Sequence, residues 1–148
     1  MKRKEVRVSE AQLAYFRKLA RDTDMEIMAY LIGDVISSEV VEIDSFEYTK
    51  KYATQKSNEV SWYMAEYERV KKKADERGRR IVGYIHSHPN WDTVMSPEDL
   101  HACIIEGHRV CGIVSTNSHT RKTFVRFWVT DSPLPCKRVE RNAKTSRA

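Results

Sequence analysis

Apolar residues near the start of the chain follow a helical period. A stripe recurs at steps of three or four residues, which is typical of an amphipathic helix ending near residue 21. Ser9 precedes this stripe and Gln12 follows three residues later, an arrangement that predicts a capped helix start. A brief alternation over residues 5–8 predicts a short strand before the helix. The stripe consists of Leu13, Phe16, Leu19 and Ala20.

The period changes between residues 25 and 48, where β-forming residues dominate. Breaks at Gly33-Asp34 and Ser37-Ser38 divide this segment, which predicts two or three antiparallel strands. A second helical stripe then runs from Val60 to Ala74, with Ser57 or Asn58 as its expected N-cap and Gly78 as its expected end.

Residues 80–86 form a short apolar run whose length suits a buried strand. After a loop, Ser96-Pro97-Glu98 predicts the start of a third helix that ends near residue 106. Residues 110–115 and 123–130 read as two further strands. The sum is an α/β (α+β) fold, a mixed sheet with about three helices, in one domain over residues 1–135. The basic segment 136–148 is expected to be a flexible tail.

Composition, charge and cysteine count limit the classes of protein to which the chain can belong. The chain has 148 residues, 41% of them hydrophobic, and a formal net charge of +5. No apolar run approaches the length of a membrane span, so no membrane association is expected. The excess positive charge lies on the two ends and on the second helix, so a nucleic-acid partner is not expected. Three irregularly spaced cysteines argue against a disulfide scaffold and for a cytoplasmic location.

Candidate metal-binding residues lie at the end of the apolar run over residues 80–86. His86 and His88 are two residues apart, so strand geometry puts both imidazoles on one face. Asp99 lies in the first turn of the predicted third helix, and the intervening loop is long enough to bring its carboxylate to the same ion. Two histidines and an aspartate would hold Zn²⁺ with a fourth position left for water, as a metallohydrolase requires.

At this point the sequence resembles a known family. His86-Ser87-His88-Pro89 followed by Ser96 and Asp99 resembles the signature of the JAMM (JAB1/MPN/Mov34) zinc metalloproteases. The segment from Glu26 to Gly33 is similar to the family's upstream glutamate pattern, except that Ala29 replaces a glycine. A residue other than proline, Met95, precedes the serine. The resemblance implies a cytidine-deaminase-like MPN fold with a curved mixed sheet.

The resemblance also implies roles for individual residues. His86, His88 and Asp99 would be the ligands of one zinc ion per chain. Glu26 would be the general base and acid; the family pattern, and not composition, selects it among eight acids between residues 22 and 49. Ser96 would stabilise the oxyanion, whereas Ser87 is expected to be structural.

The implied function is a zinc-dependent isopeptidase or peptidase. Active members of the family cleave at the C-terminal tails of ubiquitin-like proteins, and compact versions also act on sulfur-carrier proteins. The alternative is a non-catalytic MPN scaffold that binds other proteins. The remaining histidines, His101, His108 and His119, have no spacing that converges on a site, and Cys111 is expected to be a small buried apolar residue.

Overall fold

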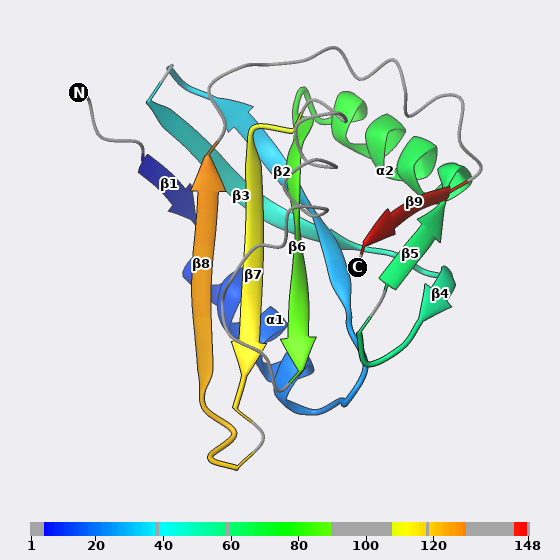
Figure 1. Ribbon diagram of the computed structural model, residues 1–148. Coiled ribbons are helices and arrows are strands. Elements are labelled where there is room, and N and C mark those ends of the chain that lie inside the picture. The colour runs from blue at the N-terminus through cyan, green and yellow to red at the C-terminus, as the bar shows by residue number, and fades with distance from the viewer. Residues whose placement is uncertain are drawn as a thin grey trace.

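The computed structural model describes residues 5–37, 39–58, 60–89, 108–117 and 119–129, together with the backbone of 144–147. The predicted third helix (97–106), Ser96 and Asp99 lie outside these residues. Within them, the sequence folds into a mixed α+β structure, and the expected fold class is confirmed (Figure 1). None of the helices in this part of the chain has the length and hydropathy to cross a bilayer.

Six strands form the main sheet, which is mixed and curved (Figure 1). Strand β1 is parallel to β3, and β6 is parallel to β7, whereas the other neighbours are antiparallel. This arrangement makes β6 a central strand. In spatial order the strands are β1 (Glu5–Val8), β3 (Val40–Tyr48), β2 (Met28–Val35), β6 (Arg80–Pro89), β7 (Val110–Thr116) and β8 (Thr123–Val129).

A helix on each face covers this sheet. Helix α1 (Glu10–Arg21) begins where predicted, because the Ser9 side chain accepts a hydrogen bond from the backbone N–H of Gln12 at 3.4 Å. Phe16 and Ala20 of α1 pack with β6 residues such as Ile85 in one apolar cluster. Helix α2 (Met64–Glu76) lies on the opposite face and contributes Val70 to a second cluster.

The predicted start of the second helix is wrong. Residues 60–63 form strand β5 (Val60–Tyr63), and α2 begins only at Met64. Val60 and Trp62 are buried in the second cluster, whereas the helical stripe placed only Val60 of these two inward. Tyr63 is the N-cap residue of α2, and its side chain makes no capping hydrogen bond. At the other end, Gly78 follows the helix as predicted, with a φ of 68°.

A small second sheet extends this region. Strand β5 pairs with β4 (Tyr52–Gln55) on one side and with β9 (Lys144–Arg147) on the other, both antiparallel. Neither β4 nor β9 is evident from the sequence pattern. Strand β9 comes from the segment expected to be a flexible tail and instead pairs along four residues of β5. The domain boundary at residue 135 stays a prediction.

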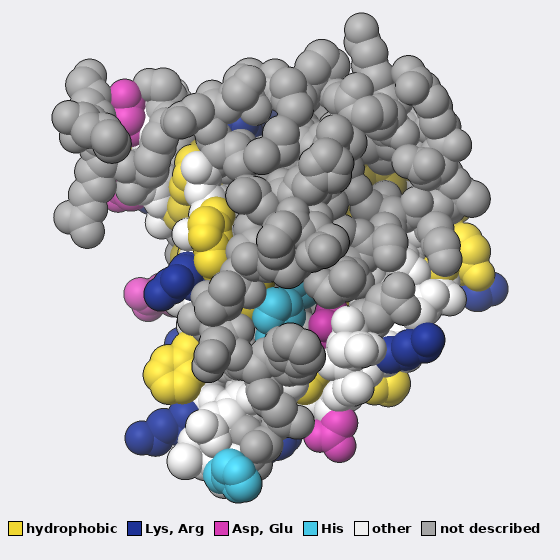
Figure 2. All heavy atoms as spheres, viewed as in Figure 1, with side chains coloured by type: hydrophobic (Ala, Val, Ile, Leu, Met, Phe, Trp, Pro, Cys, Tyr) yellow, Lys and Arg dark blue, Asp and Glu magenta, His cyan; other side chains and the backbone are white. Residues whose placement is uncertain are grey.

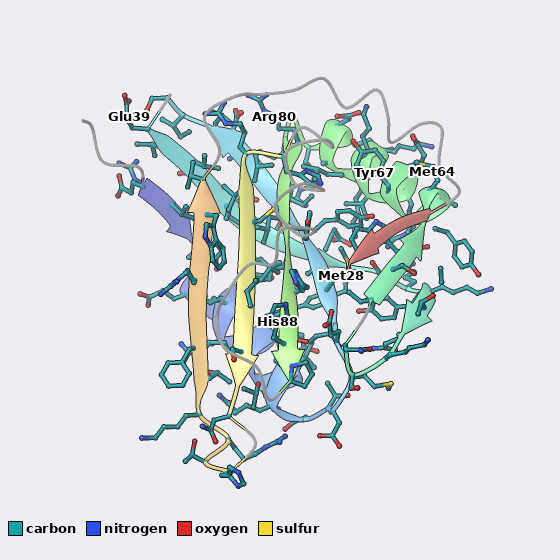
Figure 3. All side chains as sticks on the ribbon, in the orientation of Figure 1. Met28, Glu39, Met64, Tyr67, Arg80 and His88 are labelled. Atoms are coloured by element: carbon teal, nitrogen blue, oxygen red, sulfur yellow. The ribbon has the colours of Figure 1, made fainter. Side chains whose placement is uncertain are left out.

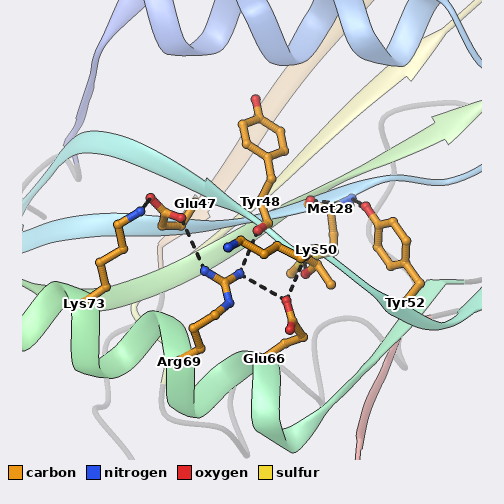
Figure 4. Close-up of polar contacts among 9 residues, drawn as sticks. Met28, Glu47, Tyr48, Lys50, Tyr52, Glu66, Arg69 and Lys73 are labelled. Atoms are coloured by element: carbon orange, nitrogen blue, oxygen red, sulfur yellow. Dashed lines mark hydrogen bonds and ion pairs between the residues drawn. The ribbon is translucent and has the colours of Figure 1, made fainter.

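Ion pairs connect α2 to the acidic face of β3 (Figure 4). The Arg69 guanidinium lies 3.0 Å from Glu66 and 3.8 Å from Glu47, and it also donates to the carbonyl oxygen of Tyr48. The ammonium of Lys73 lies 2.9 Å from Glu47. The acids of the β3 region therefore neutralise much of the positive charge that the sequence concentrates on α2.

Cys111 on β7 is fully buried in the second cluster, beside Tyr84. It is also disulfide-bonded, and the partner cysteine lies outside the described residues. The odd cysteine count thus did not exclude a disulfide. The cytoplasmic location that we inferred from that count stays a prediction.

Two glycines offer a test of the packing of β6. A β-carbon at Gly83 would coincide with the carbonyl oxygen of Val110, whereas a β-carbon at Gly78 meets nothing within 4 Å. We expect Gly83→Ala to lower the free energy of unfolding by about 2–4 kcal/mol, because β6 and β7 would have to separate. Gly78→Ala is the control; it should cost about 1 kcal/mol, for the left-handed backbone alone. Urea denaturation measures both, and equal losses would contradict the close approach of β6 and β7.

Candidate metal centre

The two histidines lie together at the end of β6. His86 is fully buried and His88 is 6% exposed. Their Nε2 atoms are 3.0 Å apart, and their rings meet edge to face with centroids 4.8 Å apart. In the space-filling view of Figure 2, a histidine side chain reaches the molecular surface near the middle of the picture. Figure 3, in the same orientation, labels His88 at that position. The strand therefore directs two ring nitrogens at one point, as the sequence predicts.

This arrangement fits two ligands of a single zinc ion. Two nitrogens bound at 2.0–2.1 Å in tetrahedral geometry lie about 3.3 Å apart, close to the distance seen here. The third predicted ligand, Asp99, is outside the described residues, as is Ser96. In the described part of the chain, no three His, Cys, Asp or Glu side chains form a metal-binding group. The zinc itself therefore stays a prediction.

Glu26 lies just beyond the end of the ladder between β2 and β6. Met28 pairs with His86 in this antiparallel ladder, and one residue further on the Ser87 N–H donates to the carbonyl oxygen of Ile27. Glu26 is the residue before Ile27. Glu26 is only 3% exposed. Met28 and His88 mark the two neighbouring strands in Figure 3. The Glu26 side chain is therefore buried near the end of β2 that pairs with His86, and its position beside the two imidazoles stays a prediction.

The backbone of Glu26 is fixed by the small sheet. Its N–H donates to the carbonyl oxygen of Lys56 at 2.7 Å, and its carbonyl oxygen accepts from Nε2 of Gln55 at 3.1 Å. Two residues after Glu26, the N–H of Met28 donates a hydrogen bond to the Tyr52 hydroxyl at 3.1 Å. Burial raises the pKa of Tyr52, so its hydroxyl stays neutral at physiological pH. Sequence reasoning missed these supports, because no periodic pattern marks β4.

Ser87 joins the segment of Glu26 to the strand of the histidines. Its hydroxyl oxygen accepts from the N–H of Ile27 at 2.9 Å, and its own N–H donates to the carbonyl oxygen of Ile27 at 2.9 Å. The side chain replaces a backbone acceptor at the point where β2 begins. The structural role expected for Ser87 therefore takes a definite form: the residue between the two histidines binds the segment that joins Glu26 to β2.

Neither of the other two described histidines, His108 and His119, forms a metal-binding group with this pair. His108 is 3% exposed, and its ring meets Tyr84 edge to face at 5.1 Å, while Tyr84 lies 6.0 Å from the ring of His86. Its spacing in the sequence gave no signal of this burial. His119 is exposed in the turn between β7 and β8. His101 lies outside the described residues.

The Ser87 contact predicts a measurable effect on stability. Ser87→Ala leaves the partly buried N–H of Ile27 without its acceptor, which should cost about 1–3 kcal/mol and speed hydrogen exchange of that amide. Ser61→Ala is a matched control, because Ser61 is equally buried and its hydroxyl makes no hydrogen bond. Urea denaturation and amide exchange would contradict the assignment if both variants behaved alike.

Comparison with known proteins identifies the family. The family described as JAB1/Mov34/MPN/PAD-1 ubiquitin protease matches residues 2–103. No curated protein matches the chain in sequence. Among solved structures, the fold is similar to a protein of Desulfitobacterium hafniense, with a TM-score of 0.69, 18% identity, and 84% of each chain covered.

Two further structures share the fold. A protein of Salinibacter ruber has a TM-score of 0.54 at 18% identity, over 87% of this chain and 91% of that one. A JAB1/MPN domain protein of Archaeoglobus fulgidus has a TM-score of 0.52 at 16% identity, over 84% of this chain and 88% of that one. These identities support the fold alone. The family match, which spans more than half of the sequence, shows that the chain belongs to the JAB1/Mov34/MPN/PAD-1 family.

Proposed function

We propose that the protein is a zinc-dependent amide hydrolase that cleaves at the C-terminal tail of a ubiquitin-like or sulfur-carrier protein. The observation that carries this proposal is the convergence of two imidazoles at the end of β6. His86 and His88 approach each other through their Nε2 atoms, and Glu26 is buried two residues before Met28, which pairs with His86. The family includes peptidases, which supports the same chemistry.

His86, His88 and Asp99 would hold the metal. When bound, zinc activates water for attack and polarises the carbonyl of the scissile amide. Glu26 accepts a proton from the attacking water and delivers it to the leaving amine. Its fixed backbone keeps the carboxylate in place during both transfers. The Ser96 hydroxyl donates a hydrogen bond to the oxygen that gains negative charge.

Zinc content tests the ligand set. The purified full-length protein should contain one zinc per chain by elemental mass spectrometry, and His88→Ala should lose it because two ligands rarely retain zinc. His119→Ala is the matched control, since this exposed turn histidine should leave the zinc content unchanged. Equal zinc in wild type and in the His88 variant would contradict the assignment.

Turnover tests the base. We expect Glu26→Gln to keep its zinc but to cleave about 10²–10⁴-fold more slowly, because the amide side chain does not accept the proton. The substrates would be ubiquitin-like and sulfur-carrier proteins with C-terminal fusions, with products identified by mass and a chelator as a second control. Glu76→Gln, at the exposed end of α2, should cleave like wild type. A protein that binds no zinc and cleaves none of these fusions would instead be a non-catalytic scaffold.

A further inference from the structure

We propose that a basic patch beside the candidate metal centre binds an acidic protein surface, which belongs to the protein whose tail is cleaved. The identification of that partner as the substrate rests on the proposed function. Three members of the patch lie in the last turns of α1, and two lie in the turn between β7 and β8. The basic patch consists of Arg17, Lys18, Arg21, Arg121 and Lys122.

Hydrogen bonds between the two segments make this patch one continuous surface. Arg17 donates from Nε to the Thr123 hydroxyl at 2.7 Å and from Nη2 to the Thr123 carbonyl oxygen at 3.0 Å. Arg121 donates from Nη2 to the carbonyl oxygen of Arg21. Lys18 lies three residues before Arg21, on the same side of the helix. Two segments about 100 residues apart are thereby joined.

The fold holds these cations together against their mutual repulsion. Arg121 is the only described residue other than glycine with a positive φ, 61°, a backbone conformation that L-amino acids rarely adopt. In this conformation its guanidinium caps the C-terminal end of α1, where a cation is favoured. The cap brings the positive charge of Arg121 beside that of Arg21.

The patch also differs from α2 in its counter-charges. Most cations on or just after α2 have an acidic partner, as Arg77 and Arg79 have Asp44. In the described part of the chain, no member of the basic patch makes an ion pair. Exposed Asp22 and Asp24 follow α1, and neither is paired with the patch there. Positive charge that the fold leaves exposed in this way attracts an acidic surface.

The β7–β8 part of the patch lies close to the candidate metal centre. Strands β6 and β7 end together, and the β7–β8 turn projects from the same end of the sheet (Figure 1). His88 pairs with Ser115, which pairs with Phe124, two residues from Lys122. Standard sheet spacing puts Lys122 about 12 Å from His88, and an extended tail of about four residues spans that distance. Helix α1 packs on the face of the sheet opposite to the imidazoles, so a body bound to its cations sends the tail around this end of the sheet.

An acidic protein suits this patch better than a nucleic acid. Nucleic-acid affinity grows with the number of phosphates neutralised along a continuous basic track. Here five cations form a compact group, and Asp22 and Asp24 border it on the helix side. These two carboxylates would repel a phosphate backbone that continued past the patch. A protein with a local group of carboxylates can contact the five cations without extending over Asp22 and Asp24.

Binding of a decaglutamate peptide tests the proposal. The labelled peptide is titrated into the full-length protein at low ionic strength, with Lys18→Glu/Lys122→Glu as the patch variant. Lys71→Glu/Lys72→Glu on α2 makes the same change in net charge on the exposed face of that helix. The patch variant should bind about fivefold more weakly or worse, and the control should change by less than about twofold. Circular dichroism checks that both variants fold.

Two further readouts decide the site and the partner class. A photo-crosslinker on the peptide should label residues 17–21 or 119–122. Equal weakening by both double variants, or labelling elsewhere, would overturn the proposal. Tighter binding of oligothymidine of equal charge through the same two lysines would overturn it in favour of a nucleic-acid surface. Binding requires neither zinc nor turnover, so this result and the test of Glu26 are independent of each other.

Discussion

The position of β6 between β2 and β7 is the constraint on which the site depends. Antiparallel pairing with β2 sets Met28 opposite His86, and parallel pairing with β7 sets Ser115 beside His88. Because side chains alternate between faces, a slip of one residue in either ladder would turn both imidazoles toward α1. Burial on both faces of β6 opposes such a slip, since Val82 and Ile85 fill one cluster while Tyr84 fills the other.

The small sheet gives the site its second support. Strand β4 contacts the main sheet at the residues that introduce β2, through Tyr52 and Gln55. The carbonyl oxygen of Lys56 completes this contact by accepting from the N–H of Glu26. The role proposed for the Glu26 carboxylate needs such anchors, because proton transfer depends on placement within hydrogen-bond reach. Ser87 binds the next residue, Ile27, so this segment is held by both the small sheet and β6.

Charge is distributed by the same packing. The sequence concentrates acids between residues 22 and 49 and bases on α2, and the fold brings much of the two sets together. These pairs are half-exposed and individually contribute little to stability. Their larger effect is on the surface field, because they leave the positive charge near α1 and the β7–β8 turn comparatively exposed. The net charge of +5 is thus distributed unevenly over the molecular surface.

Local patterns in the sequence determined α1 with its Ser9 cap, the end of α2 at Gly78, and the buried strand that presents His86 and His88 together. Each depends on contacts within a few residues, so periodicity and capping chemistry suffice. Tertiary structure decided the rest: β5 in place of a helix start, the pairing of β4 and β9, and the anchoring of the Glu26 backbone by Gln55 and Lys56. Strand pairing joins segments some 60 residues apart, and its register is set by the packing of whole sheets rather than by any local signal.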